Sequence, residues 1–361
     1  MKKIIFLTED ITKAGGVNRV VNLWANFFAK KKFMVEIIAT NIKDIYYPLD
    51  SSILLTHWNF EYKHKILGLP YNIIQTYFLL KKYNNNNKIN FVIDRAIHIE
   101  PIWLFRKLGF FKNFNLIYFV HGGSSDFRNF YMKRPYMRHK VKMIFEAFDK
   151  VICLYDDEKN YPKQVKREKL FFIPNPLPFE PSNIEFNQKE NIVLSLGRIT
   201  KEKGIDILIK AWNILGDKTK DWKLQIIGDG KDKQKFIELA KKLKIANIEF
   251  KDATTDVKPL YEKTKIFVIP SLFEGMPMTI LEAMACKCAV ISSKTAGGKK
   301  LIKDNETGLL FDINNEDQLK EKIGFLIENE KVLKKIAVNG FKSIQNYKLE
   351  KIEKKWEDVF V

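Results

Sequence analysis

The sequence predicts an α/β protein made of two doubly wound domains, each a parallel sheet covered by helices. Short continuous apolar runs rich in β-branched residues, such as 3–8 and 266–269, alternate with segments of helical spacing, which is typical of strands buried on both faces. A chain of 361 residues is long enough to bury two separate cores. A proline-rich segment at 174–178, followed by polar residues at 180–190, interrupts this alternation near the middle of the chain.

The domain boundary is placed at this proline-rich segment because proline fixes its own φ and restrains the residue before it. We therefore expect an N-terminal domain over residues 1–178 and a C-terminal domain over residues 188–345, with a linker at about 176–189. The first domain begins with a strand–loop–helix–strand unit over residues 3–40, which is the βαβ pattern of a parallel sheet.

The composition is that of an ordinary globular protein, with 46% hydrophobic and 29% charged residues. Three cysteines are too few and too unevenly spaced for a disulfide framework, which fits a reducing cytoplasm. No Cys and His cluster has the spacing of zinc ligands. The first residues are expected to form a strand rather than a signal peptide, and no apolar run approaches the roughly 18 residues of a spanning helix.

The net charge of +19 is unevenly distributed. Residues 1–180 hold 29 Lys and Arg against 16 Asp and Glu, whereas residues 181–361 hold 33 against 27. The basic N-terminal half predicts attraction to an anionic surface, which leaves membrane lipid, a phosphate-bearing acceptor and nucleic acid as alternatives.

The most informative stretch runs from 266 to 298 and alternates strand, loop, helix, strand and loop. Its loop is expected to lead through Pro277 into a helix over 278–286, because proline suits the first helical position. Unpaired amide groups at such a helix start favour anions. Two carboxylates, Glu274 and Glu282, flank this site with seven residues between them. Because carboxylates repel phosphate, both are expected to accept hydrogen bonds from hydroxyl groups.

A second loop in the C-terminal half carries two cations after a predicted strand at 191–196. Arg198 and Lys203 lie between Gly197 and Gly204, and Arg198 is the only arginine among residues 181–361. A planar guanidinium and a point-charge ammonium together suit a diphosphate. The sequence GDGKDK from Gly228 lacks the third glycine of a dinucleotide fingerprint, and no P-loop motif is present.

In the N-terminal half, two glycine-containing loops follow predicted strands. Gly15 and Gly16 precede a helix over about 17–31, and His121 ends a strand over 115–120, at the edge where open α/β sheets bind ligands. The basic and aromatic segment 128–150 has two interpretations: a solvated helix whose apolar side packs on the sheet, or an interfacial element that contacts anionic lipid.

The stretch FEGMPMTILEAMA resembles the E-x7-E motif of the retaining glycosyltransferases of family 4, and GRITKEKG resembles their donor-diphosphate segment. The resemblance is strong over residues 190–312 and weaker over the first 180. It implies a GT-B fold, in which two Rossmann-like doubly wound domains face each other across a cleft. The N-terminal domain would bind the acceptor and the C-terminal domain the nucleotide sugar. A last helix at about 346–361 would cross back to the N-terminal domain.

The resemblance also implies roles for individual residues. The catalytic set would be Glu274, His121, Arg198 and Lys203. The nucleotide-sugar donor would contact a larger set, namely Gly16, Arg198, Lys203, Gly228, Ala253, Glu274, Gly275, Met276, Pro277, Met278, Thr279 and Glu282. No metal and no cofactor besides the donor substrate would be needed, because cations and amides neutralise the diphosphate.

The resemblance therefore implies a metal-independent, retaining transfer of a hexose or N-acetylhexosamine from a nucleotide diphosphate sugar, with UDP the expected nucleotide. The acceptor would be a glycan or lipid-linked molecule in cell-surface polysaccharide or glycoconjugate biosynthesis. The protein is expected in the cytoplasm, peripheral at the inner face of the membrane and in contact with anionic lipid. Two alternatives stay open: a soluble family 4 synthase with a small acceptor, and a catalytically silent relative that binds nucleic acid or another ligand. Gly275-Met276 after Glu274 and AGGKK at 296–300 depart from the family pattern and leave the sugar unassigned.

Overall fold

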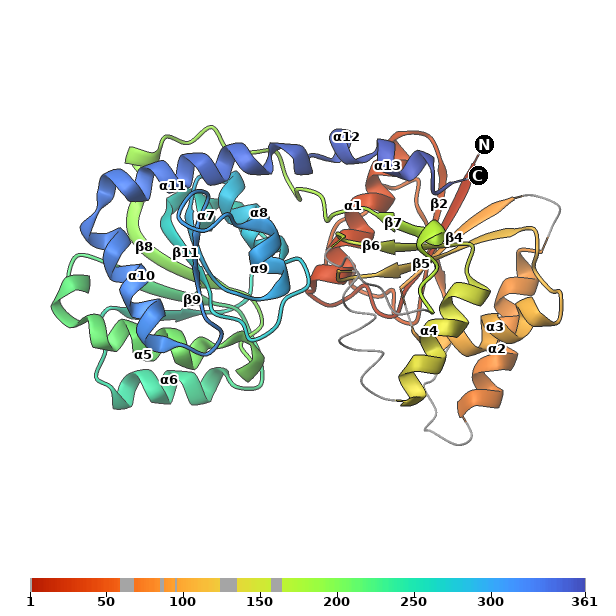
Figure 1. The fold of residues 1–361 in the computed structure, drawn as a ribbon, viewed down its shortest axis with the longest axis horizontal. Coiled ribbons are helices and arrows are strands. Elements are labelled where there is room, and N and C mark those ends of the chain that lie inside the picture. The colour runs from red at the N-terminus through yellow and green to blue at the C-terminus, as the bar shows by residue number, and fades with distance from the viewer. Residues whose placement is uncertain are drawn as a thin grey trace. The chain divides into compact units, whose positions relative to one another are not determined.

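The computed structural model describes residues 2–58, 68–84, 88–94, 96–123, 135–156 and 164–360. The chain divides into two compact units. The first unit comprises Met1–Pro176 and Leu349–Val361, and the second comprises Leu177–Lys348. Figure 1 shows a sheet flanked by helices in each unit. Among the described residues, no helix combines the length and the apolar character that crossing a membrane requires.

The first unit is built on a sheet of seven parallel strands in the order β3-β2-β1-β4-β5-β6-β7. β1 pairs with β2 on one side, Lys3 opposite Met34, and with β4 on the other, Lys3 opposite Ile89. Strand order therefore reverses between β1 and β4. The strands are β1 Lys3–Leu7, β2 Met34–Ala39, β3 Leu54–His57, β4 Ile89–Ile93, β5 Phe114–Val120, β6 Lys150–Cys153 and β7 Leu170–Phe172. The helices are α1 Gly16–Lys30, α2 Gly68–Lys82, α3 Ile99–Lys107 and α4 Pro135–Ala147, with 3-10 helices η1 Ala96–His98 and η3 Arg167–Lys169.

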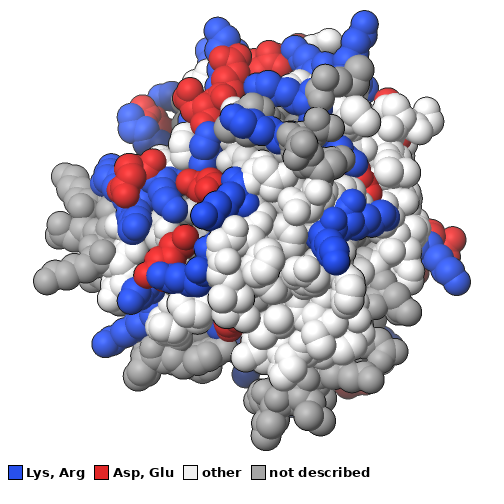
Figure 2. Space-filling view, turned by 90° about the vertical axis from the view of Figure 1, so that its right-hand side faces the viewer, with Lys and Arg blue, Asp and Glu red and all other residues white. Residues whose placement is uncertain are grey.

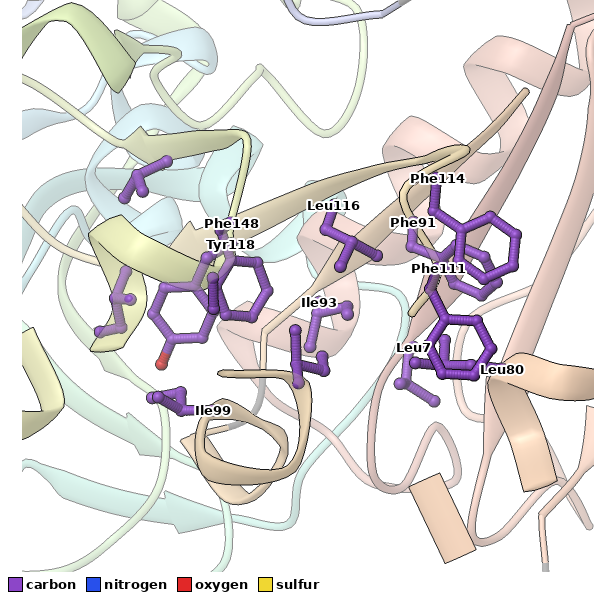
Figure 3. Close-up of a cluster of buried hydrophobic side chains, with 14 of the residues drawn as sticks. Leu7, Leu80, Phe91, Ile93, Ile99, Phe111, Phe114, Leu116, Tyr118 and Phe148 are labelled. Atoms are coloured by element: carbon purple, nitrogen blue, oxygen red, sulfur yellow. The ribbon is translucent and has the colours of Figure 1, made fainter. Parts of the chain in front are cut away.

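An aromatic-rich core lies between this sheet and the helices α2, α3 and α4. Figure 3 shows rings and aliphatic side chains of the sheet facing those of the helices. The Phe111 and Phe114 rings are stacked, with centroids 5.6 Å apart, and Tyr118 on β5 meets Phe148 at 5.1 Å. Every residue of β4 and β5 is buried, which explains why these strands are continuous apolar runs rather than alternating ones.

The C-terminal segment of the chain packs on α1 in the first unit. The expected helix over 346–361 is present as two short helices, α12 Leu349–Ile352 and α13 Lys354–Glu357, after the 3-10 helix η7 Ile344–Tyr347 of the second unit. The ring of Trp356 packs on those of Trp24 and Phe28, with centroids at 5.2 and 5.5 Å. The Val359 carbonyl accepts a hydrogen bond of 2.8 Å from the buried Asn115 side-chain amide. These contacts hold the C-terminal segment on the first unit.

The second unit is built on six parallel strands in the order β10-β9-β8-β11-β12-β13, and the order reverses between β8 and β11. The strands are β8 Glu190–Leu196, β9 Lys223–Ile227, β10 Ile248–Lys251, β11 Thr264–Ile269, β12 Ala289–Ser293 and β13 Leu309–Phe311. The α-helices are α5 Ile205–Leu215, α6 Lys233–Lys242, α7 Lys258–Lys263, α8 Met278–Ala285, α9 Ala296–Leu301, α10 Glu316–Glu328 and α11 Glu330–Ser343. The 3-10 helices are η4 Phe186–Gln188, η5 Lys201–Lys203 and η6 Gly216–Thr219.

We predict that Trp356→Ala destabilises the first unit by about 3–5 kcal/mol, the usual cost of removing a buried aromatic ring. Hydrogen exchange of peptides from β1 and α1, followed by mass spectrometry, measures this loss within the first unit. Phe325→Ala is the control, because Phe325 is exposed on α10 of the second unit. Equal protection of α1 in wild type and Trp356→Ala would contradict the anchoring role.

Candidate functional site

Several of the predicted donor residues of the second unit lie on the two loops where its strand order reverses. The loop at 197–204 follows β8 and the loop at 270–277 follows β11, and these two strands are neighbours in the sheet. Open α/β sheets bind ligands at such a reversal, because successive crossovers leave toward opposite faces and open a crevice at the carboxyl ends of the strands. The sheet topology therefore brings together two loops that are far apart in sequence.

The backbones of these loops are in close contact. Gly204 has a φ of 65°, and a Cβ atom there would lie 2.1 Å from the Pro270 carbonyl oxygen. Gly228 has a φ of 147°, and its Cβ would lie 1.9 Å from the Gly197 carbonyl oxygen. The Leu272 amide also donates a 2.8 Å hydrogen bond to the Glu202 carbonyl. Glycine is required at positions 204 and 228 because no side chain fits between the backbones.

Lys203 and Glu274 form a direct ion pair across the two loops. The Lys203 Nζ lies 2.6 Å from the Glu274 Oε1, and both side chains are partly buried. The Ser271 hydroxyl donates a second hydrogen bond, of 2.7 Å, to the same oxygen. The structure thus joins the cation predicted to bind phosphate and the carboxylate predicted to bind sugar hydroxyls. The sequence pattern contained no sign of Ser271 as a partner.

Glu282, the second carboxylate of the motif, lies inside the second unit. It is on the second turn of α8 and only 1% exposed. The hydroxyl of the buried Tyr261 on α7 donates a 2.8 Å hydrogen bond to its Oε2. Sequence reasoning missed Tyr261, because a tyrosine on a short helix gives no sign that it meets a carboxylate 21 residues later.

Arg198 is exposed at the start of the β8 loop. The backbone amide of Glu202 and the Thr200 hydroxyl hold the pKa of the Glu202 carboxyl below its ordinary value, and the charges of Lys231 and Arg198 add to this effect. Arg198 and Lys203 thus lie on the same loop, and the Arg198 side chain is exposed whereas that of Lys203 is partly buried.

The remaining residues of the donor loop lead into α8. The helix begins at Met278 with Pro277 as its N-cap, so that proline lies just before the first helical position rather than at it. The Gly297 amide donates a 3.0 Å hydrogen bond to the Glu274 carbonyl, which joins this loop to the start of α9. Met276 and Met278 are buried. The backbones of Gly275 and Gly297 lie so close that a Cβ atom at Gly297 would be 2.5 Å from the carbonyl oxygen of Gly275.

Gly228 and Ala253 follow the neighbouring strands β9 and β10. The Ala253 amide donates a 2.9 Å hydrogen bond to the Asp229 carboxylate, which also pairs with Lys233 at 2.8 Å. Lys233 and the Ala253 amide hold the pKa of Asp229 below its ordinary value. The two predicted donor contacts are therefore linked through a carboxylate that the sequence analysis did not single out.

In the first unit, the predicted site residues His121 and Gly16 also follow strands near the reversal of strand order. His121 follows β5, and its ring stacks on Phe119 with centroids 4.4 Å apart. Its Nε2 lies 3.8 Å from the Oδ2 of Asp94, at the end of β4. The Thr8 hydroxyl, at the end of β1, donates a 2.9 Å hydrogen bond to the same oxygen. Sequence reasoning missed Asp94 and Thr8, although Thr8 ends the predicted buried strand at 3–8.

Gly16 begins α1, and a Cβ there would meet no atom within 4 Å. Of the basic segment 128–150, residues 128–134 lie outside the described residues. The helix α4 buries Val141, Ile144 and Phe145 in the core, and Lys140 pairs with Glu100 at 2.7 Å. Within the described ranges, no three His, Cys, Asp or Glu side chains are grouped as metal ligands would be.

The sequence of the chain is similar to those of known glycosyltransferases. Residues 178–343 match the family model described as glycosyl transferases group 1. An uncharacterized glycosyltransferase of Haemophilus influenzae is 28% identical over 99% of this chain and 100% of its own length. A Campylobacter jejuni protein is 27% identical over 99% of this chain and 97% of its own length. It is named as the alpha-1,4-N-acetyl-D-galactosaminyltransferase of a GalNAc-containing diNAcBac-PP-undecaprenol.

The same fold is present in a solved structure. A mutant of S. aureus TarM, in complex with Fondaparinux, alpha-GlcNAc-glycerol and UDP, matches with a TM-score of 0.77 over the full length of both chains, at 16% identity. This likeness, together with the two parallel sheets, shows the GT-B fold.

We predict that Tyr261→Phe lowers the stability of the second unit by about 1.5–3 kcal/mol, because a buried carboxylate loses a hydrogen-bond donor. Hydrogen exchange of peptides from α8 measures this change. A double-mutant cycle with Glu282→Gln isolates the contact between the two side chains. A coupling energy near zero in that cycle would show that the hydroxyl does not hold Glu282.

Proposed function

Because the chain belongs to the group 1 glycosyltransferases and has the GT-B fold, we propose that it transfers a hexose or N-acetylhexosamine from a UDP-sugar to a lipid-linked or glycan acceptor. The single observation that carries this proposal is the Lys203–Glu274 pair at the strand reversal of the second unit. In this pair a cation that suits a diphosphate lies 2.6 Å from a carboxylate that suits sugar hydroxyls, which supports the proposal.

On the donor side, Lys203 and Arg198 neutralise the diphosphate as negative charge develops on the leaving group. The backbone amides of Met278 and Thr279 at the start of α8 assist them. Glu274 accepts hydrogen bonds from hydroxyls of the transferred sugar. Glu282 accepts hydrogen bonds from the ribose hydroxyls. The hydroxyl of Tyr261 orients its carboxylate by donating to Oε2. Cations and amides thus carry the phosphate charge without a divalent metal.

Family membership implies that the anomeric configuration is retained. We propose front-side attack, in which the departing phosphate oxygen takes the proton of the acceptor hydroxyl as the new glycosidic bond forms. No separate base is then required. His121, held between Phe119 and Asp94 in the first unit, contacts the transferred sugar in this proposal. Glu274 and Glu282 are not assigned the acid and nucleophile roles of a glycosidase.

The acceptor proposal rests on charge and on relatives. The first half of the chain carries most of the positive excess, with 29 Lys and Arg against 16 Asp and Glu, and the Campylobacter relative is named for a substrate linked to PP-undecaprenol. A pyrophosphate-linked lipid matches a basic surface. We therefore place the reaction in cell-surface glycan biosynthesis, on a protein that is peripheral at the inner face of the cytoplasmic membrane.

We predict that Lys203→Gln and Glu274→Gln each slow transfer by roughly 10²- to 10³-fold, as expected for the loss of one preorganised charge in an active site. Release of UDP from UDP-GlcNAc, UDP-GalNAc or UDP-glucose in the presence of an undecaprenyl-pyrophosphate glycan measures the rate, with and without EDTA. Lys201→Gln is the matched control, because Lys201 is an exposed lysine on the same 3-10 helix, η5.

Chelation by EDTA should leave the wild-type rate unchanged. If Lys203→Gln transferred sugar at the same rate as Lys201→Gln, the ion pair would have no role in the reaction. A rate that requires added divalent cation would overturn the metal-independent mechanism.

A further inference from the structure

The first unit exposes a concentration of large hydrophobic side chains. Among the described residues, eleven large hydrophobic side chains are exposed, and five of them lie on α2 or in the turn after α3. Four of these form what we call the α2–α3 patch: Ile74 at 51%, Phe78 at 61%, Leu108 at 62% and Phe110 at 45% exposure. Single exposed apolar residues are common on protein surfaces, but a cluster marks an interaction site.

The α2–α3 patch is continuous across the two elements. Ile74 and Phe78 are four residues apart on α2 and therefore share one face of the helix. The ring of Tyr77 joins them to the turn, with its centroid 5.7 Å from that of Phe78 and 6.1 Å from that of Phe110. The patch is thus one surface rather than four separate side chains.

The backbone of the turn is built to hold the patch outward. The Phe110 amide donates to the Phe105 carbonyl at 2.8 Å and the Gly109 amide to the Arg106 carbonyl at 3.2 Å, which is the Schellman pattern of a helix end. Phe111 then takes a φ of 56°, an unfavourable conformation for an aromatic residue. Its ring is buried and stacks on Phe114. Phe111 anchors the turn, while Leu108 and Phe110 stay at the surface.

The charges at the borders of the α2–α3 patch are mostly positive, although Lys107 pairs with Glu146. Residues 68–82 and 101–115 contain no Asp or Glu, while Lys81, Lys82, Lys107 and Lys112 are exposed at its borders. Lys81 lies over the Tyr77 ring at 5.6 Å, and Lys107 reaches Glu146 at 3.5 Å. Figure 2 looks onto the side of Figure 1 on which α2 and α3 lie, and shows a broad uncharged area with basic side chains in it and mixed basic and acidic side chains beside it.

We propose that the α2–α3 patch docks the first unit onto an anionic lipid bilayer. Phe78, Leu108 and Phe110 enter the boundary between headgroups and acyl chains, and the lysines contact lipid phosphates. A second copy of the chain fits less well, because a two-fold interface over this patch would bring the lysines of both copies together. The inference rests on the proposed function, since a lipid-linked acceptor lies in such a bilayer.

Sedimentation with vesicles tests the proposal. Wild type should bind vesicles of phosphatidylglycerol and phosphatidylcholine more tightly than vesicles of phosphatidylcholine alone. The double variant Phe78→Ser/Leu108→Ser should lose at least about tenfold in partitioning, because two apolar side chains no longer enter the bilayer. Lys107→Gln/Lys112→Gln should lose about tenfold on anionic vesicles only. The control Ile214→Ser/Phe325→Ser removes two exposed apolar residues of the second unit and should bind like wild type.

Equal vesicle binding by wild type and Phe78→Ser/Leu108→Ser would overturn the proposal. So would a wild type that binds anionic vesicles no more tightly than phosphatidylcholine vesicles. A patch variant that dissociates a dimer but keeps vesicle binding would assign the surface to a second copy instead. Transfer to a short water-soluble acceptor should be the same in the patch variants as in wild type. Vesicle binding without any sugar transfer would therefore refute the proposed function and leave the docking surface standing.

Discussion

The reversal of strand order in each parallel sheet is the constraint on which both groups of site residues depend. Because crossovers between parallel strands are right-handed, helices leave the two sides of the reversal toward opposite faces of the sheet. The loops after β8 and β11 are thereby left at one edge, with their backbones in contact through Gly204 and Pro270. Only this topology brings the side chains of Lys203 and Glu274 to 2.6 Å. The ion pair is a consequence of the sheet rather than of local sequence.

The pair also explains how a partly buried loop can carry charge before a ligand arrives. A lone partly buried lysine or glutamate would be costly, but each offsets the other, and Ser271 adds a hydrogen bond. In the proposed function, a nucleotide sugar would replace both interactions at once, because its phosphates suit Lys203 and its hydroxyls suit Glu274. A nucleoside diphosphate alone would take the lysine and leave the carboxylate without its cation. On this proposal the site would favour a complete donor over its product.

The first unit repeats this geometry with different chemistry. Its reversal lies between β1 and β4, and the strand ends place Thr8, Asp94 and His121 side by side. Here a carboxylate and an imidazole take the place of the lysine and glutamate. The two units therefore carry different side chains at the same topological position.

Short apolar runs and the spacing of Glu274 and Glu282 are local features, so the strands, the glycine-containing loops and the two glutamates could be predicted from the residues alone. The family, and with it the fold, followed from two such local motifs. The fold was needed to show that Tyr261 contacts Glu282, that Asp94 contacts both Thr8 and His121, and that Trp356 of the C-terminal segment packs on Trp24. These contacts join residues that are distant in the chain, and packing rather than periodicity selects them. The exposure of Leu108 and Phe110 could not be predicted from the sequence either. It depends on the left-handed backbone conformation of Phe111, whose ring is buried while these two neighbours stay at the surface.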